Sequence, residues 1–249
     1  MADPVDIELD EAGSPGERLF DERPTEFIVR DAFVLGAVPL ALAGLAGVFG
    51  LSWLGYLLMA LTVFVACFFR NPPRDIPGDE RTVVSPADGR VIAVDEASLP
   101  DGTLVPRVGI FLSVFNVHVN RAPVAGRVIG IERGGERFRA AFDSRADRDN
   151  VYCAMSLETL QKEIVRVVQI TGLIARRIVS HPVAGEWVQR GARYGLIRFG
   201  SRVDVYLPPG SVITVTRRQK VRGGSSELGR LPEPTSEGSG ASTDPQEDA

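Results

Sequence analysis

The stretch "IRFGSRVDVYLP", residues 197–208, joins two runs whose composition is typical of β-strands, 194–199 and 203–207. The pair Gly200-Ser201 separates the runs, and a Gly-Ser pair between two strands usually forms a turn. Charged residues lie close to the pair on both sides. The stretch therefore predicts a β-rich domain and raises the question of whether Ser201 has a chemical role.

Similar short runs, rich in Val and Ile and broken by Gly and Pro, recur after the Pro-rich linker "NPPRDIPGDE". They lie at residues 82–84, 90–95, 105–114, 127–132, 164–170, 174–180 and 212–216. This spacing is typical of a β-rich domain, which we place at residues 71–220. We also expect one helix, at 145–158 or at 157–162.

Residues 32–69 contain no charged side chain over 38 positions. A run of this length exceeds one membrane span of about 20 residues and suits two short spans. Arg30 precedes the run and Arg70 follows it, which favours a hairpin with both ends in the cytoplasm. We therefore expect an apolar membrane hairpin at 32–70, with the β-rich domain on the cytoplasmic side of the cell membrane. A hairpin buried within a soluble protein is the alternative. A cleaved signal peptide is disfavoured because the run is too long and begins too late.

Charge is distributed unevenly along the chain. Residues 1–31 carry ten acidic side chains and three Arg, and residues 221–249 carry six acidic side chains and two Arg. The residues in between carry 23 basic and 16 acidic side chains. We expect an acidic N-terminal tail and a disordered C-terminal tail at these ranges. The basic body beside an apolar hairpin suits an anionic lipid surface, whereas no motif for nucleic acid is present.

Cysteine and lysine are both scarce. The chain has two cysteines and neither a CxxC motif nor a Cys/His cluster. This pattern disfavours a disulfide framework and a bound metal. Lys162 and Lys220 are the two lysines. Pyridoxal phosphate enzymes need a lysine for their Schiff base, so this composition offers little support for that cofactor.

Four residues supply the types needed for nucleophilic catalysis: Ser201, His118, His181 and Asp88. A reactive serine needs a base, and the base needs a group that orients it. Each residue also has an ordinary interpretation, since Asp before Gly is common in turns. The pattern Gly-x-Ser-x-Gly does not occur around Ser201, which disfavours an ordinary serine hydrolase.

Three segments repeat a turn-and-strand pattern: "PADGRVIAV" (86–94), "PVAGRVIGI" (123–131) and "PVAGEWV" (182–188). The last of these resembles biotinyl and lipoyl carrier domains, which implies a β domain like the barrel-sandwich hybrid. It also leaves a non-catalytic, membrane-anchored adaptor as an alternative function. Carrier domains present a lysine at a hairpin tip, and neither lysine of this chain occupies such a place.

Five motifs in order along the chain carry a more specific resemblance. They are "FFRNPPRDIP" (68–77), "VVSPADGRV" (83–91), "FLSVFNVHVNRAPVAGRV" (111–128), "QITGLIARRIV" (169–179) and "RYGLIRFGSRVDVYLP" (193–208). Together they resemble the phosphatidylserine decarboxylase family in its short bacterial and archaeal form. The apolar hairpin that precedes them is similar to that family as well.

The resemblance implies an inactive proenzyme that cleaves itself at Gly200-Ser201. The Ser201 hydroxyl would attack the Gly200 carbonyl, and the resulting ester would be lost by β-elimination to leave dehydroalanine. Hydrolysis with release of ammonia would then leave an N-terminal pyruvoyl group. The expected products are a β chain (1–200) and an α chain (201–249), which stay together as a heterodimer; a higher oligomer is left open.

In this family the pyruvoyl ketone forms a Schiff base with the serine amine of phosphatidylserine in the membrane. Loss of CO2 and protonation then give phosphatidylethanolamine, a step of phospholipid biosynthesis. An archaeal-type ether lipid that carries serine is an alternative substrate. Since every motif lies at or beyond the end of the hairpin, we expect a chain without residues 1–69 to cleave itself.

By motif matching, His118 is the expected base and proton donor, and Asp88 is the expected aspartate that orients a histidine or assists cleavage. Long-form relatives have a second histidine three residues after the first, where this chain has Arg121. Because an arginine stays charged, Arg121 cannot act as a base. Either His118 performs both tasks, or Arg121 binds phosphate or carboxylate while the tasks are divided differently. His181 matches no motif.

Overall fold

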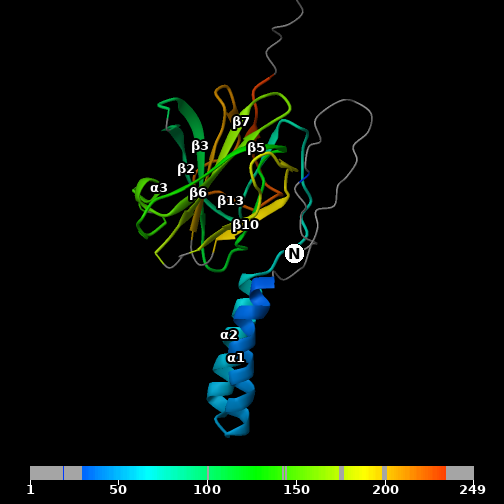
Figure 1. Ribbon diagram of the computed structural model, residues 1–249, viewed down its shortest axis with the longest axis vertical. Helices are drawn as coiled ribbons and strands as arrows, with labels where there is room; N and C mark the ends of the chain where they lie inside the picture. Colours follow the sequence, from blue (N-terminus) through cyan, green and yellow to red (C-terminus); the bar gives the residue numbers. More distant parts are fainter. Residues whose placement is uncertain are drawn as a thin grey trace, which may run out of the picture.

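The computed structural model describes residue 19 and residues 30–99, 101–141, 143, 145–173, 177–197 and 201–233. Within these ranges the chain is mainly β, as the sequence predicts, and a pair of helices extends from one end of the β domain (Figure 1). The remaining residues of the two predicted tails lie outside the described part of the chain.

The two helices occupy the uncharged segment. They are α1 (Arg30–Val48) and α2 (Ser52–Phe68), and Gly50 joins them with a φ of 70° that a residue with a side chain rarely adopts. The helices pack side by side, with Gly36 of α1 facing Val65 of α2. Among the described residues, no helix meets the combined requirements of length and apolar character for crossing a membrane.

One large antiparallel sheet forms most of the β domain, with the strand order β13-β2-β3-β11-β7-β6-β5-β9. Its strands are β2 (Gly89–Ser98), β3 (Leu104–Leu112), β5 (Gly126–Gly134), β6 (Tyr152–Glu158), β7 (Ile164–Thr171), β9 (Trp187–Val188), β11 (Ser201–Tyr206) and β13 (Lys220–Val221). The strand β11 lies between β3 and β7, so both of its edges are hydrogen-bonded.

Two small antiparallel sheets complete the domain. One has the order β1-β14-β12, from β1 (Thr82–Val84), β12 (Val212–Ile213) and β14 (Glu227–Arg230). The other has the order β4-β10-β8, from β4 (Val119–Arg121), β8 (Ile178–Ser180) and β10 (Arg193–Ile197).

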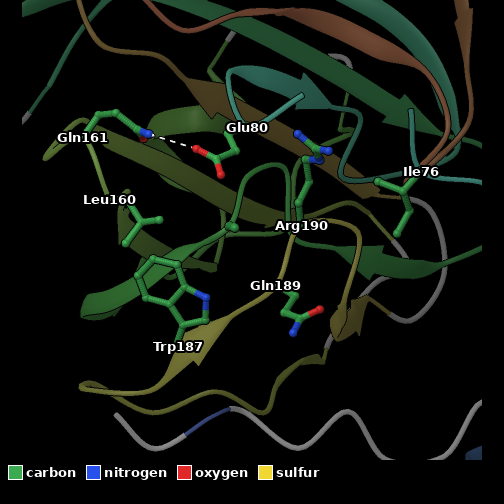
Figure 2. Close-up of a pocket in the computed structure, with 8 residues that line it drawn as sticks. Ile76, Glu80, Leu160, Gln161, Trp187, Gln189 and Arg190 are labelled. Carbon is green, nitrogen blue, oxygen red and sulfur yellow. Dashed lines mark hydrogen bonds between the residues drawn. The ribbon is translucent and has the colours of Figure 1, made fainter. Parts of the chain in front are cut away.

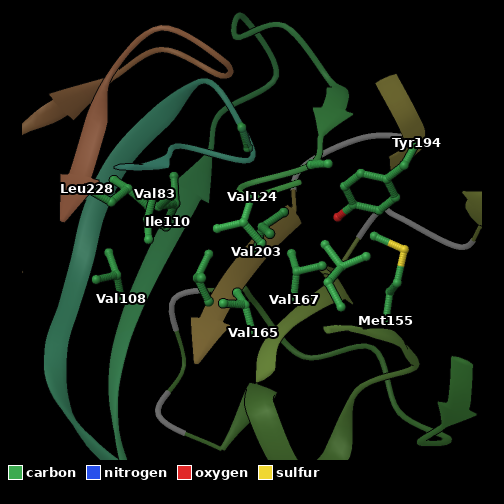
Figure 3. Close-up of a cluster of buried hydrophobic side chains, with 14 of the residues drawn as sticks. Val83, Val108, Ile110, Val124, Met155, Val165, Val167, Tyr194, Val203 and Leu228 are labelled. Atoms are coloured by element: carbon green, nitrogen blue, oxygen red, sulfur yellow. The ribbon is translucent and has the colours of Figure 1, made fainter. Parts of the chain in front are cut away.

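The main core joins these sheets. Val203 of β11 and Ile110 of β3 pack in one buried cluster with Val83, Tyr194 and Leu228 from the small sheets (Figure 3). Since side chains alternate between the faces of a strand, the valines of β11 point into this core while its charged residues point to the other face. Burial of apolar surface therefore fixes which face of β11 each residue occupies.

The prediction of a helix at 145–158 or at 157–162 is wrong for most of these residues. A short helix, α3 (Ala146–Asp149), is present, but the following residues form β6, which pairs with β5 and β7. Cross-strand pairing and the burial of Met155 and Leu157 prevail over local helix preference here. The predicted strand at 174–180 is described for residues 178–180, while residues 174–176 lie outside the described part.

The expected C-terminal tail at 221–249 differs from the structure in its first part. Strands β13 and β14 fall wholly or partly within it, and Leu228 and Leu231 are buried in or beside the main core. The β domain therefore extends to about the end of the described residues rather than to residue 220. Residues 234–249 lie outside the described part.

A buried ion pair lies on the outer face of β11. Arg202 donates to both carboxylate oxygens of Asp204, at 2.6 Å and 2.8 Å, and Asp204 is fully buried. Arg107 of β3 lies 3.6 Å from Asp204 and also binds Asp95 and Asp147. The network joins β11 to β2, β3 and α3.

We expect Asp204→Asn to lower the free energy of unfolding by about 3–5 kcal/mol, because Arg202 would stay buried without its counter-charge. Urea or thermal unfolding measures this loss. Asp95→Asn is the matched control, since Asp95 binds the same Arg107 but its side chain is 45% exposed, and it should cost under about 1 kcal/mol. Equal losses of unfolding free energy in the two variants would contradict a greater contribution of Asp204 than of Asp95 to the network.

Candidate active site

Ser201 is the first residue of β11 and is fully buried. It lies opposite Leu112 of β3 and Thr171 of β7. Its Oγ is buried and has no hydrogen-bond partner within the described part of the chain. Such an atom is rare in a folded protein and indicates a functional position when it belongs to a nucleophile. Gly200 lies outside the described residues.

His118 lies directly before β4 and close to the end of β10. The Ile197 N–H donates to the His118 carbonyl at 3.4 Å, and Ile197 precedes Ser201 by four residues. The chain from Ile197 to Ser201 limits the distance between their Cα atoms to about 15 Å. The topology therefore places His118, the predicted base, at the end of β10 that leads to Ser201, the predicted nucleophile.

The imidazole of His118 has two different nitrogens. Nδ1 lies 2.9 Å from the carbonyl oxygen of Asn116, so Nδ1 carries the proton and donates. Nε2 is buried and has no hydrogen-bond partner among the described residues. The lone pair of Nε2 is thereby available to accept a proton.

Burial keeps this imidazole neutral. His118 is 1% exposed, and its ring stacks on Phe68 with 4.0 Å between the ring centroids. Loss of solvation lowers the pKa of His118 to about 4, and the positive charge of Arg70 acts in the same direction. At neutral pH the ring is therefore in the form that serves as a base.

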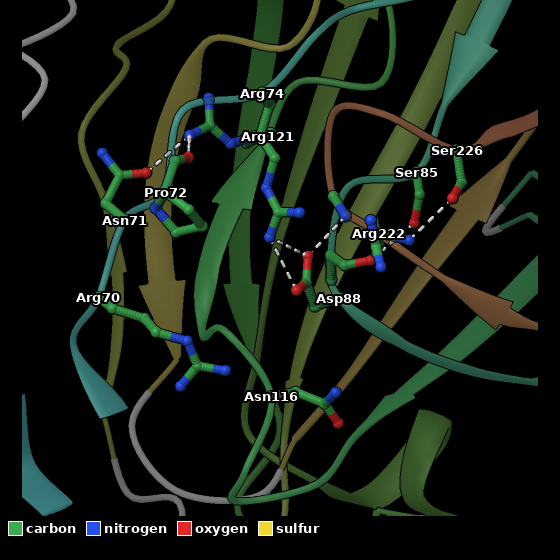
Figure 4. A network of polar contacts seen from close by, with 12 residues as sticks. Arg70, Asn71, Pro72, Arg74, Ser85, Asp88, Asn116, Arg121, Arg222 and Ser226 are labelled. Atoms are coloured by element: carbon green, nitrogen blue, oxygen red, sulfur yellow. Dashed lines mark hydrogen bonds and ion pairs between the residues drawn. The ribbon is translucent and has the colours of Figure 1, made fainter. Parts of the chain in front are cut away.

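Asp88 binds Arg74 rather than His118 within the described part of the chain (Figure 4). Arg74 Nη2 donates to its two carboxylate oxygens at 2.9 Å and 2.8 Å, and the Gly223 N–H donates at 2.7 Å. Asp88 thus joins the segment that follows α2 to the turn before β14. The orienting role that motif matching gave to Asp88 is not seen as a direct contact with the histidine.

Arg121 ends β4 and is held by three oxygens. Its guanidinium donates to Gly191 O at 2.9 Å, Asn71 Oδ1 at 2.6 Å and Pro72 O at 3.3 Å. With Arg74 it lines a pocket of about 410 Å³. The other residues of this basic pocket are Asn71, Pro72, Pro73, Ile76, Gln189, Arg190, Gly191 and Ala192.

A second hollow, of about 370 Å³, adjoins the basic pocket through Ile76, Gln189 and Arg190 (Figure 2). Trp187 and Leu160 line it, and Gln161 donates to Glu80 at 3.3 Å across one side. None of Ser201, His118 and Asp88 lines this hollow or the basic pocket. The basic pocket is linked to these residues through Arg74, which binds Asp88, whereas the second hollow contains neither Arg74 nor Arg121.

His181 lies just after β8 and is partly buried, and its backbone N–H donates to the carbonyl of Tyr194 in β10. No described contact brings it to Ser201. Its position is consistent with the absence of a matching motif.

Sequence reasoning missed a buried amide pair. Gln169 Nε2 donates to Asn120 Oδ1 at 2.8 Å, while Asn120 Nδ2 and Gln169 Oε1 lack partners in the described part of the chain. Gln169 lies opposite Val203 and so on the same face of the sheet as Ser201, one pleat along β7. Both amides belong to motifs quoted above, and their polarity within Val-rich strands was the available signal.

Comparisons with known proteins identify the family of the chain. The family model for phosphatidylserine decarboxylase matches residues 61–228. A phosphatidylserine decarboxylase proenzyme of Citrifermentans bemidjiense is 50% identical over 179 residues, which are 71% of this chain and 81% of that protein. A protein of the same name from Burkholderia pseudomallei is 43% identical over 214 residues, which are 84% of this chain and 98% of that protein. The chain therefore belongs to the phosphatidylserine decarboxylase family.

The resemblance drawn from the five motifs is thus confirmed. The adaptor and the ether-lipid alternatives gain no support from these relatives. The relatives' name "proenzyme" agrees with a chain that is made in an inactive form.

The Arg74–Asp88 pair should contribute measurably to folding. We expect a coupling energy of about 1 kcal/mol or more in a double-mutant cycle of Arg74→Met and Asp88→Asn, because both side chains are largely buried. Urea unfolding of the two single variants and the double variant measures it. The exposed pair Arg81–Glu233 is the control, with a coupling near zero. Coupling energies of the same size would show that Asp88 is not a structural link.

Proposed function

We propose that the chain is a self-cleaving proenzyme that becomes a pyruvoyl-dependent phosphatidylserine decarboxylase. The observation that carries the proposal is Ser201: a buried nucleophile with an unsatisfied Oγ, at the start of a strand that is paired on both edges. Membership of the family supports the reaction, and the burial of Ser201 and His118 supports their proposed roles in it.

Self-cleavage begins when the Ser201 hydroxyl attacks the carbonyl carbon of Gly200. The neutral His118 accepts the hydroxyl proton at Nε2, and its Nδ1 stays bound to the Asn116 carbonyl. The C–N bond of the Gly200-Ser201 peptide breaks as the ester forms, and His118 passes the proton to the departing nitrogen. Abstraction of the Ser201 Cα proton then expels the Gly200 carboxylate, and hydrolysis of the new N-terminus releases ammonia.

The two products stay associated through β11. The α chain (201–249) begins with this strand, and six of its residues pair with β3 and with β7 of the β chain (1–200). The Arg202–Asp204 pair and the valines of the core add to this contact. A heterodimer is therefore the expected form of the enzyme.

The surroundings of Ser201 fit a pyruvoyl group. Ser201 Oγ makes no hydrogen bond to a described residue, so its removal during elimination breaks no contact of the fold. Lys162 and Lys220 are both exposed, and neither lies buried near the serine strand. When formed, a pyruvoyl group at this position would supply a conjugated carbonyl system that serves as an electron sink for decarboxylation.

The basic pocket is the proposed place for the lipid head group. Arg74, Arg121 and Arg190 line it, and it directly follows α2 along the chain. Guanidinium groups bind phosphate with two parallel hydrogen bonds. Arg121 is thus proposed to bind the phosphate of the substrate, and its contacts with Asn71 and Gly191 hold it in the pocket wall.

The helical pair is the proposed membrane anchor, with the β domain at the cytoplasmic surface. Its large apolar side chains point outward: Trp53 is 69% exposed, Tyr56 78% and Phe49 70%. An apolar surface of this extent needs a covering that water does not provide. The basic residues that follow α2 would then face anionic lipid head groups. The same anchor would bring the lipid substrate to the basic pocket.

Ser201→Ala should abolish self-cleavage, because alanine has no hydroxyl to attack the preceding carbonyl. Denaturing gels and intact mass should show one chain of 249 residues, while the unmodified protein gives chains of 200 and 49 residues. Decarboxylation of phosphatidylserine should be lost together with cleavage. An unmodified protein from native membranes that remains one chain would sink the proposal.

The double substitution Leu45→Asp and Leu57→Asp should abolish binding to lipid vesicles. Both side chains are more than half exposed on the helical pair, so the fold tolerates the change while the apolar surface is lost. Flotation with phosphatidylglycerol-containing vesicles measures binding. Val212→Asp, at an equally exposed apolar position on β12, is the control and should float normally. Flotation of the double variant would contradict the anchor.

A further inference from the structure

Phe68, the last residue of α2, differs from most of its helix. It is 1% exposed, whereas Trp53 and Leu57 of the same helix are more than half exposed. Its ring packs with Phe69, Val65 and residues of the β domain in a separate buried cluster. The helical pair therefore enters the β domain at this end through an aromatic side chain.

The contact of Phe68 with His118 has a specific geometry. The ring planes are 26° apart and the centroids are 4.0 Å apart, which is a stacked arrangement. The ring face covers one side of the imidazole, and the Asn116 carbonyl holds Nδ1 in the ring plane. Two constraints in different directions thus fix the orientation of Nε2.

We propose that Phe68 is a positioning residue for His118, so that the end of the helical hairpin forms one wall of the active site. The inference rests on the proposed function, in which His118 Nε2 takes the serine proton. Phe68 touches neither the serine nor the substrate in this account. It acts by excluding water from the imidazole and by fixing its plane.

The charges around His118 agree with this role. Arg70, two residues after Phe68, is the charged group that acts on the imidazole, and its field disfavours a second positive charge. The other described contacts of the ring come from Phe68 and from the Asn116 carbonyl, which are neutral. Removal of the Phe68 ring should therefore act on His118 by admitting water to the stacked face of the imidazole.

The inference revises one expectation. Deletion of residues 1–69 was expected to leave self-cleavage intact, because the motif residues with chemical roles lie beyond the hairpin. Phe68 and Phe69 fall within that deletion, and Phe68 is the stacking partner of the base. We now expect such a truncation to impair cleavage.

The decisive experiment follows the titration of His118 in the full-length Ser201→Ala chain, which stays uncleaved and needs no activity. The chain has two histidines, so NMR of labelled histidine in detergent micelles resolves His118 with His181 as an internal reference. With Phe68 present, His118 should stay neutral above pH 5. In Phe68→Leu its pKa should rise toward the ordinary value of about 6.5.

Matched variants separate positioning from general packing. Phe64→Leu makes the same change one turn earlier in α2, in the same cluster, and should leave the titration of His118 unchanged. Phe68→Tyr keeps the ring and should also leave it unchanged. If Phe68→Leu does not fold, Phe68→Met replaces it, because methionine fills irregular space well. Identical titration of His118 with and without the Phe68 ring would overturn the inference.

A kinetic measurement on chains that retain Ser201 provides the second readout. Since protonation removes the base, cleavage of Phe68→Leu should be about tenfold slower at pH 5.5 than at pH 8, if its His118 titrates near 6.5. The unmodified chain should show little change over this range. A flat profile in Phe68→Leu would count against the inference, whereas failure of the unmodified chain to cleave would count against the proposed function alone.

Discussion

The hydrogen bonds along both edges of β11 are the constraint on which the site depends. They fix Ser201 opposite Leu112 and Thr171, and the alternation of the strand then decides what lies on each face. Val203 enters the core, and Asp204 enters the buried ion pair on the other face. A shift of one residue would exchange these environments, placing charge in the core and valine against Arg107. Ser201 thus keeps its position because a shifted register of β11 would be energetically unfavourable.

Burial serves two purposes in the same region. Around β11 it stabilises the fold, and around His118 it keeps the imidazole neutral and the proton on Nδ1. The second effect needs a contribution from α2, whose last residue covers the ring. In the proposed mechanism, the apolar helix α2 is therefore part of the catalytic centre as well as of the proposed anchor. The two proposed roles meet at Phe68, the last residue of the helix.

Much of the fold could be predicted from sequence, because Val- and Ile-rich runs between Gly and Pro carry the period of a strand. Ser201 and His118 could be proposed as site residues because they lie in ordered motifs, and the structure buries both side chains. The partner of Asp88 could not, since it is Arg74 in the linker after α2, and no local pattern joins the two. The strand β14 was missed because Leu228 is a single apolar residue among Gly, Ser and charged residues, and its burial depends on distant partners.

The position of β11 in the sheet has a consequence for the life of the chain. The strand pairs with β3 and β7, which are made earlier, but the core beside it is completed only by Leu228 and Leu231, which are made later. Ser201 therefore emerges from the ribosome well before the environment that makes it reactive is complete. In the proposed mechanism, scission of the backbone would therefore wait until the domain has assembled, and a misfolded copy would keep its chain intact. A cleaved chain would then be one that has folded.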